Sequence, residues 1–205
     1  IATDQSIEKT YPYNSLVQPV TSEDALLPHI TVTAQNQVIP PWNIFYPSST
    51  YSHSYVSNGL GQVVGNEIWI QIAFNTPQFI SLIQIRGHGS NANYDPTSVR
   101  FEYSTTENDT DLVSVAGEFG TLQSFAQNYD GLLGKFATFN LGDNVINNAR
   151  ILRIYGTVPS NADFRFFIGG VVLYGESNFY IPTPDPNPHI DIPSSYWSRF
   201  YNQGY

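Results

Sequence analysis

Four aromatic residues stand in a stretch of the chain where strand formation does not require them. Trp42, Tyr46, Tyr51 and Tyr55 occur within residues 35–66, a segment rich in Pro, Ser, Asn and Gly without strand-like alternation. Tyr and Trp rings can stack on the C–H face of a sugar while their polar edges reach water. These rings therefore predict a surface for a polar, neutral ligand, or else they pack the loops or a neighbouring subunit.

Polar side chains suited to hydroxyl groups occur in the same segment and in two later ones, at residues 40–58, 87–96 and 157–164. Amide, carboxylate and imidazole groups select among sugar hydroxyls by donating and accepting hydrogen bonds. The candidates are His53, His88, Asn91, Asn93, Tyr94, Asp95, Asn161 and Asp163. If the three segments meet in the folded chain, they form a carbohydrate-binding site.

The residue types that enzymes use do not occur in a catalytic or metal-binding spacing. His29, His53, His88 and His189 are far apart, and the chain has no Cys, which excludes thiol catalysis and thiolate metal sites. The glycine-rich run at residues 59–65 precedes a strand-like segment, whereas a dinucleotide loop precedes a helix. We therefore expect no catalytic residues, no enzymatic activity and no cofactor.

Four large side chains fall on strand-like segments. Arg150, Arg153 and Arg165 are expected to form buried or rim ion pairs within the fold, and Trp69 is expected to be a core ring. We therefore expect these four residues to stabilise the fold rather than to bind a ligand.

Three strand-like segments must position the loops. Residues 67–74 carry apolar side chains at every second position, which is the pattern of a strand with one face in a core. Residues 98–104 alternate in the same way. Between them, residues 79–86 are apolar on both faces and follow the turn-forming pair Thr76 and Pro77, which predicts a central strand covered on both sides. Three strands in so short a stretch favour a β-sandwich.

Further strands are expected on both sides of this group. Residues 29–34, 136–141, 149–155 and 164–174 are candidates, and residues 105–134 are a long connection that contains one or two short strands. The sequence has no long amphipathic helix. The predicted fold class is therefore all-β.

Composition limits the partners of the chain. It has 205 residues, with 8 Lys and Arg against 17 Asp and Glu, a formal net charge of −9. This charge repels phosphate backbones, so we expect no binding of nucleic acid. The sequence has no apolar run of the ~20 residues that a membrane-spanning helix needs.

The two ends differ from the middle of the chain. Residues 1–28 and 176–205 are predicted to be irregular arms on a sandwich formed by residues 29–175. The C-terminal arm joins a Pro-rich stretch to an aromatic end, and such arms gain order by docking on another chain. The candidate assembly residues are Tyr196, Trp197, Phe200 and Tyr201. The sequence begins at Ile1, which suggests cleavage of a precursor, including a secretion signal, or a piece of a longer chain.

The strand segments carry short motifs in a characteristic order. They are WIQIAF at residues 69–74, a strand ending in Gly at 79–87, SVRFEYS at 98–104, FNL at 139–141, ARILRI at 149–154 and VVLYG at 171–175. In this order they resemble the strand motifs of the discoidin-like, or coagulation factor 5/8 C-terminal type, domain. The resemblance spans residues 29–175.

This resemblance implies a jelly-roll sandwich of about eight antiparallel strands whose loops at one end bind glycans, membrane head groups or other proteins, without catalysis. Sugar-binding members often hold a structural Ca²⁺, but this chain has Asn58 and Gly170 where the family places acidic ligands. Without these two hard oxygen ligands, we do not expect the family's Ca²⁺ site. Membrane insertion is not expected either, since the chain lacks loop-tip aromatics with basic neighbours.

Two functions therefore follow from the sequence. The first is a non-catalytic, extracellular or surface-exposed module that binds a glycan or glycoprotein. The second is a structural subunit of a surface assembly, such as a filament, fibre or viral shell, whose arms clasp neighbouring subunits and make it a homo-oligomer.

Overall fold

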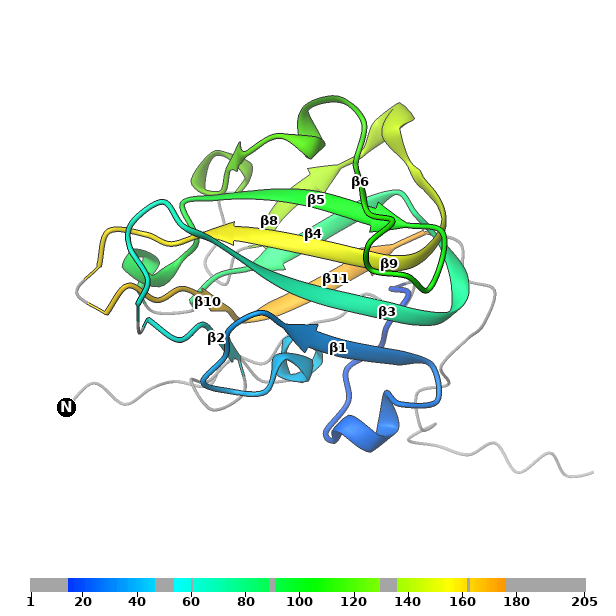
Figure 1. Cartoon of the computed structure of the whole chain (residues 1–205), viewed down its shortest axis with the longest axis horizontal. Helices are drawn as coiled ribbons and strands as arrows, with labels where there is room; N and C mark the ends of the chain where they lie inside the picture. The colour runs from blue at the N-terminus through cyan, green and yellow to red at the C-terminus, as the bar shows by residue number, and fades with distance from the viewer. Residues whose placement is uncertain are drawn as a thin grey trace, which may run out of the picture.

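The computed structural model describes residues 15–46, 54–59, 61–88, 91–129, 136–161 and 163–175. Regular structure in these residues consists of β-strands and short 3₁₀ helices, without an α-helix. No helix in this part of the chain is long and apolar enough to cross a membrane. Two layers of strands lie one in front of the other (Figure 1). The all-β prediction is confirmed.

The larger layer is a six-stranded antiparallel sheet. Its strand order is β1-β3-β9-β5-β6, and β7 also pairs with β5. The strands are β1 (Ile30–Ala34), β3 (Glu67–Ile80), β5 (Ser98–Ser104), β6 (Val113–Ser114), β7 (Gln123–Ser124) and β9 (Ile146–Thr157). The two longest, β3 and β9, pair side by side in the middle of the sheet.

The second layer is a three-stranded sheet in the order β11-β4-β8, accompanied by the short pair β10-β2. The strands are β2 (Tyr55–Val56), β4 (Leu82–Arg86), β8 (Phe136–Asn140), β10 (Phe167–Ile168) and β11 (Gly170–Tyr174). The 3₁₀ helices in the connections are η1 (Glu23–Ala25), η2 (Pro41–Phe45), η4 (Ala92–Tyr94), η5 (Gly117–Gly120), η6 (Ala126–Asn128) and η7 (Gly142–Asn144). Seven described strands have five or more residues, which agrees with the predicted sandwich.

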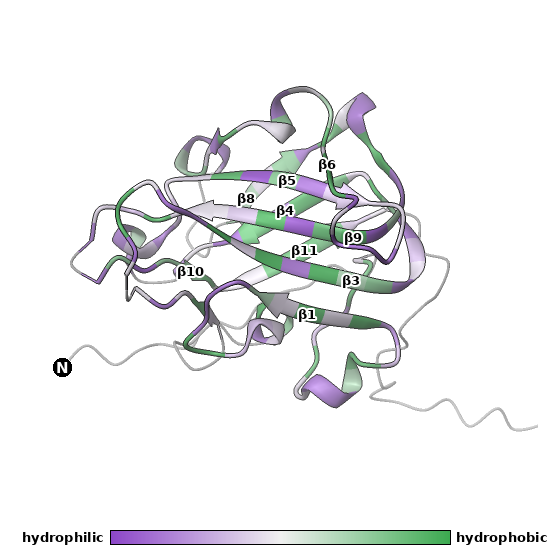
Figure 2. Cartoon of the chain, in the orientation of Figure 1, coloured by the Kyte–Doolittle hydropathy of each residue, from purple (hydrophilic) through white to green (hydrophobic). Residues whose placement is uncertain are grey.

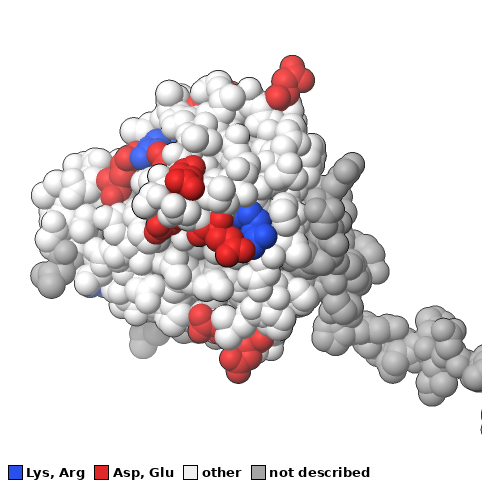
Figure 3. All heavy atoms as spheres, turned by 45° about the vertical axis from the view of Figure 1, so that its right-hand side comes forward, with Lys and Arg blue, Asp and Glu red and all other residues white. Residues whose placement is uncertain are grey.

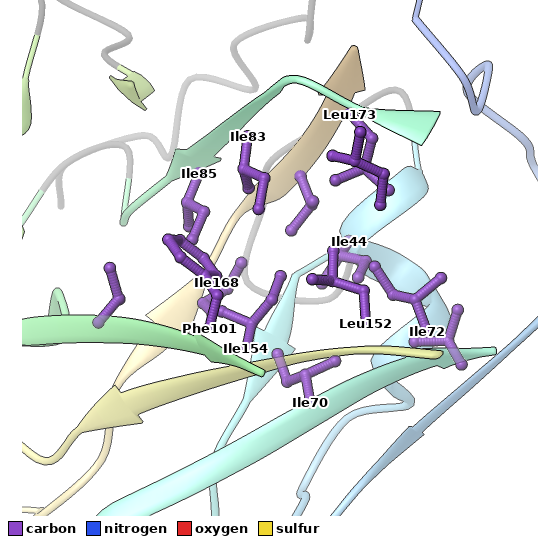
Figure 4. Close-up of a cluster of buried hydrophobic side chains, with 14 of the residues drawn as sticks. Ile44, Ile70, Ile72, Ile83, Ile85, Phe101, Leu152, Ile154, Ile168 and Leu173 are labelled. Atoms are coloured by element: carbon purple, nitrogen blue, oxygen red, sulfur yellow. The ribbon is translucent and has the colours of Figure 1, made fainter. Parts of the chain in front are cut away.

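The core lies between the two layers. Hydrophobic and hydrophilic residues alternate along β3, β5 and β9 (Figure 2). Ile70 and Ile154 from the larger sheet point toward Ile83 and Leu173 from the smaller one (Figure 4), and all four are fully buried. Burying one such side chain contributes about 1.5–3 kcal/mol. Period-two patterning on facing strands therefore holds the layers together.

The turn predicted at Thr76 and Pro77 does not form. Strand β3 continues through both residues to Ile80, and its pairing with β9 shifts register between Ala73 and Gln78. Proline has no amide proton to donate to a neighbouring strand. At an irregularity in the strand pairing no such hydrogen bond is made, so Pro77 is tolerated there. The chain instead crosses between sheets at Ser81, whose amide donates to Tyr174 O at 2.8 Å.

Strand β4 is central in its sheet, as predicted, but is not fully covered on both faces. Ile83 and Ile85 are fully buried, whereas Leu82 and Gln84 keep part of their surface exposed. The hydrophobic core contacts one face of this strand only. The smaller sheet is therefore amphipathic, like the larger one.

Trp69 lies on the outer face of the larger sheet, which corrects the prediction of a core ring. It is half-buried, and the Arg153 guanidinium lies 4.4 Å from its ring centroid. On the same face Arg100 lies 3.7 Å from the Tyr155 ring and pairs with Glu67 at 2.9 Å. Charged residues form small mixed groups on a mostly uncharged surface (Figure 3).

The described part of the N-terminal arm, residues 15–28, packs on the sandwich. Ser15 forms an antiparallel bridge with Tyr174, and Leu16 N donates to Leu173 O at 2.7 Å. Leu16 and Leu26 are buried and belong to the core. The division of the chain at residues 28 and 175 stays a prediction, since residues 1–14 and 176–205 are outside the described residues.

Candidate functional site

Two of the three candidate loops meet at one end of the sandwich. Three hydrogen bonds join the segment after β4 to the end of β9 and the segment after it. Thr97 N donates to Thr157 O at 3.1 Å, Asn161 Nδ2 donates to Asn93 O at 3.0 Å, and the Tyr94 hydroxyl donates to Asp163 Oδ2 at 3.1 Å. The antiparallel arrangement places both loops at this edge, because β4 and β9 end there.

A cluster of three rings forms the centre of this end. The His88 and Phe167 centroids are 4.7 Å apart at 87°, and those of Tyr94 and Phe167 are 5.1 Å apart at 72°. His88 and Tyr94 are themselves 5.7 Å apart. Phe167 is buried, while the other two rings keep part of their surface exposed. This ring trio therefore offers two accessible aromatic surfaces on a buried base.

The η4 turn positions His88 and Tyr94. Asn91 caps the turn, since its Oδ1 accepts from Asn93 N at 3.1 Å. Asn91 N donates to His88 Nδ1 at 3.0 Å. A nitrogen that accepts carries no proton, so the proton of the neutral imidazole is on Nε2. Local hydrogen bonds thus fix both the turn and the tautomer of His88.

Asp95 positions the loop from below and has only 7% of its surface exposed. Its Oδ1 accepts from His88 N at 2.5 Å, and its Oδ2 accepts from the Tyr129 hydroxyl. Burial raises the pKa of the Asp95 carboxyl, while these hydrogen bonds oppose the rise. Burial and the Asp95 carboxylate also raise the pKa of Tyr129. A side chain at Gly87 would meet both groups, because its Cβ would lie 2.1 Å from Asp95 Oδ1.

Asn161 organises the second loop. Its Oδ1 accepts from Asp163 N and Arg165 N at 3.1 and 3.2 Å, and its Nδ2 donates to Arg165 O at 2.6 Å. The loop holds Phe164 at φ +48° with 38% of its surface exposed. A bulky residue with positive φ is rare. Phe164 was not among the candidate site residues. The strand predicted over residues 164–174 begins only at Phe167, because the chain turns at Phe164.

A pocket of about 320 Å³ adjoins the η4 turn. Its lining residues are Ala92, Asn93, Asp95, Pro96, Thr97, Phe125, Ala126, Tyr129, Pro159 and Ser160. It is lined by both loops but not by the ring trio, and Asp95 and Tyr129 contribute polar atoms to it. The η4 turn therefore contributes Ala92 and Asn93 to the pocket and Tyr94 to the ring trio.

The rings of the first candidate loop are placed differently. Tyr55 has no exposed surface, its hydroxyl donates to Asn36 O, and burial raises its pKa. Its ring lies 5.9 Å from Phe166, so Tyr55 is a core residue and its prediction as a ligand contact is wrong. Trp42 and Tyr46 are half-buried on or beside η2, 6.0 Å apart, and Trp42 packs against the core.

Several candidates lie outside the described residues. Tyr51 and His53 belong to this group, as do the assembly residues Tyr196, Trp197, Phe200 and Tyr201. Their predicted roles stay predictions. The structure thus groups His88, Asn91, Tyr94, Asp95, Asn161 and Asp163 at one end of the sandwich.

The two positions compared with a Ca²⁺ site supply no carboxylate. Asn58 follows β2, and its backbone oxygen accepts from Asn36 Nδ2 at 3.0 Å. Gly170 begins β11 opposite Arg86. Among the residues that the structure describes, no three His, Asp or Glu side chains gather in a group able to hold a metal ion.

No protein-family model and no curated protein matches this sequence. Solved structures do resemble its fold. The family 32 carbohydrate-binding module (CBM32) of NanJ from Clostridium perfringens, in complex with galactose, has a TM-score of 0.53 at 13% identity over 70% of this chain and 92% of that one. Module CBM32-3 of a family 31 glycoside hydrolase from the same organism has a TM-score of 0.54 at 16% identity, over 72% and 91%.

An F5/8 type C domain from Bacteroides fragilis has a TM-score of 0.51 at 14% identity, over 81% of this chain and 99% of that domain. At such identities the likeness concerns the fold. The chain has the discoidin-like sandwich that its strand motifs predict.

Proposed function

We propose that this chain is a non-catalytic carbohydrate-binding module whose ligand contacts the ring trio and the loops around it. The observation that carries the proposal is the position of the partly exposed His88 and Tyr94 rings beside exposed polar groups of Asn91, Asn93 and Asp163. The solved CBM32 modules of the same fold, with galactose bound in one of them, support it.

The chemistry of the loop end suits a sugar. An aromatic face stacks on the C–H groups of a pyranose, and amide and carboxylate groups beside it bind the hydroxyls. Tyr94 and Asp163 are linked at 3.1 Å, and Asn161 holds both loops together. The site is thus ordered before a ligand arrives, which lowers the entropy lost on binding.

The same contacts argue for binding without catalysis. His88 Nδ1 accepts from the Asn91 backbone, so this nitrogen is occupied by the turn and does not activate a hydroxyl group. The Asp95 carboxylate is buried and holds the loop. We propose a position outside the cell or on its surface, where glycans are exposed to such a module.

Isothermal titration calorimetry against glycans selected on an array tests the proposal. Replacing Tyr94 by Ala removes one ring of the trio, and we expect affinity to fall about tenfold, the value of one aromatic contact. Tyr94→Phe removes only the hydroxyl bonded to Asp163 and should cost less. Tyr174→Phe is the matched control, since its hydroxyl bonds to Gln84 Oε1 at the other end of β11.

Two outcomes would contradict the proposed function. One is an array of broad glycan classes without a reproducible hit. The other is equal affinity of the wild type, Tyr94→Ala and Tyr174→Phe proteins, with unchanged circular dichroism spectra. The first result would contradict glycan binding, and the second would remove the ring trio from the binding surface.

A further inference from the structure

Arg165, in the loop after β9, is a charged side chain without an ion pair to any residue that the structure describes. Two arginines form the ion pairs that the sequence predicts, Arg150 with Glu107 and Arg153 with Asp109 at 3.7 Å. Arg100 also pairs, with Glu67 at 2.9 Å. Arg165 forms no ion pair with any described residue, so its predicted ion pair is wrong. Its Nε atom is buried and has no hydrogen-bond acceptor in this part of the chain.

The position of Arg165 follows from the strand pair β10-β2. This pairing continues beyond the strands, since Ser57 N donates to Phe166 O at 3.1 Å and Phe166 N donates to Ser57 Oγ at 2.9 Å. Residues two apart on an extended chain face the same side. Arg165 therefore lies on the same side as Phe167, the base of the ring trio.

Neighbouring residues hold Arg165 in place without neutralising its charge. Asn161 bonds to both the backbone N and O of Arg165. A Cβ at Gly59 would lie 3.1 Å from Arg165 Cγ, so the absent side chain leaves room for the arginine stem. Asp163 is only two residues away, yet its carboxylate accepts from Tyr94 at 3.1 Å. The loop thus fixes the backbone of Arg165 next to the segment that carries Tyr94, while the Asp163 carboxylate is bonded to Tyr94.

A half-buried cation with no counter-ion among the described residues loses part of its hydration without a compensating ion pair. The planar fork of a guanidinium matches an oxyanion, to which it donates two parallel hydrogen bonds. We infer that the ligand of this site is an acidic glycan, whose carboxylate or sulfate ester binds Arg165 while a sugar ring contacts the trio. The inference rests on the proposed function and changes the expected ligand from neutral to anionic.

The local charge matters because the whole chain repels anions. With a formal net charge of −9, the long-range field disfavours an acidic ligand. Short-range pairing in a partly desolvated site has to exceed that repulsion. The preference for an acidic glycan should therefore depend on Arg165 itself rather than on total charge.

Calorimetry with matched disaccharides tests the inference. The probes are a galactose disaccharide, the corresponding galacturonic acid disaccharide and a 6-sulfated galactose disaccharide. We expect the wild type to bind at least one acidic probe about 10- to 100-fold more tightly than the neutral one, the range for a hydrogen-bonded charge. The better acidic probe identifies carboxylate or sulfate as the group recognised.

Two variants of Arg165 and one control complete the design. Arg165→Gln should lose the preference, so that the ratio of acidic to neutral affinity falls to about one, because the charged contact is removed. Arg165→Lys keeps the charge without the fork and should give an intermediate preference. Arg150→Gln makes the same charge change on β9, paired with Glu107, and should keep the full preference.

Each other outcome has a defined meaning. Equal or tighter binding of the neutral probe by the wild type overturns the inference and leaves the proposed function intact. A folded Arg165→Gln protein that loses neutral and acidic binding equally also overturns it, because Arg165 is then a general sugar contact. If Arg150→Gln loses the preference as well, total charge is the cause and the inference fails. Failure of every probe and of the glycan array removes both proposals.

Discussion

Replacing Gly87 by Ala should disrupt the support of the ring trio. The new Cβ would lie 2.1 Å from Asp95 Oδ1 and 2.7 Å from the Tyr129 hydroxyl, whereas real Cβ atoms essentially never come within 3.0 Å of another atom. The carboxylate must therefore retreat by nearly an ångström. That movement breaks its hydrogen bonds with His88 N and Tyr129, which hold the loop.

The magnitude follows from these two contacts. Hydrogen bonds to a charged group contribute about 1.5–3 kcal/mol each. With partial relaxation around the site, we expect a loss of about 2–4 kcal/mol in the free energy of unfolding. For a chain of this size the melting temperature should fall by roughly 5–15 °C. Affinity for the glycan should fall as well, because His88 is displaced.

Thermal and urea unfolding followed by circular dichroism measure the effect. Gly142→Ala is the control, since Gly142 has φ +54° and open space around it, so this change costs only the backbone strain of about 1 kcal/mol. Gly87→Ala combined with Asp95→Ala should lose less than the sum of the two single changes, because the clash partner is absent. Wild-type stability of Gly87→Ala, or strict additivity in the double variant, would refute the steric reasoning.

Three further predictions concern the same molecule. Burial raises the pKa of Asp95 in the folded protein, so folding favours the protonated carboxyl. Relative to Asp95→Asn, the stability of the wild type should be highest below pH ~3.9 and should fall as pH rises through the folded pKa. Urea unfolding from pH 3.5 to 7 measures this. Equal pH profiles would contradict this. Asn161→Ala should weaken glycan binding more than tenfold while lowering stability by only about 1–2 kcal/mol, measured by calorimetry and unfolding. Leu152→Ala, at a fully buried position, should destabilise by about 2–5 kcal/mol without changing affinity in the remaining folded protein.

Strand positions could be predicted wherever one face of a strand meets the core. The bounds of β5 match residues 98–104, and Val99 and Phe101 are buried as the alternation predicts. The alternation fails at the end of the strand, where Tyr103 is partly exposed and Ser104 is buried. The boundary between β3 and β4 could not be predicted, because Pro77 normally ends a strand and is tolerated here only by a shift in register. Trp69 was misplaced because a large ring was assigned to the core although the alternation puts it opposite Ile68 and Ile70. The ring is covered by Arg153 instead.

The loop residues could be predicted as a group but not one by one. Polar residues in the segments after β4 and β9 do lie together, because both strands end at the same edge. Tyr55 was misassigned because a two-residue strand has too few positions to show alternation. The importance of Phe164 and Arg165 depends on a backbone with positive φ and on a missing counter-ion. The backbone angle and the missing counter-ion both depend on which residues are close in space, and a sequence pattern does not give that information.

The bridge between Ser15 and Tyr174 has a consequence for how this sandwich can be joined to other proteins. Tyr174 pairs with Leu82 at the start of β4, and Gly170 pairs with Arg86 at its end, so the bridge and the η4 turn are separated along β4 by about 13 Å. The backbone thus enters and leaves the sandwich at adjacent points on one side, with the loops on the other. A unit with this geometry can be grafted into a surface loop of a carrier protein, and the end that bears the ring trio then projects away from the carrier.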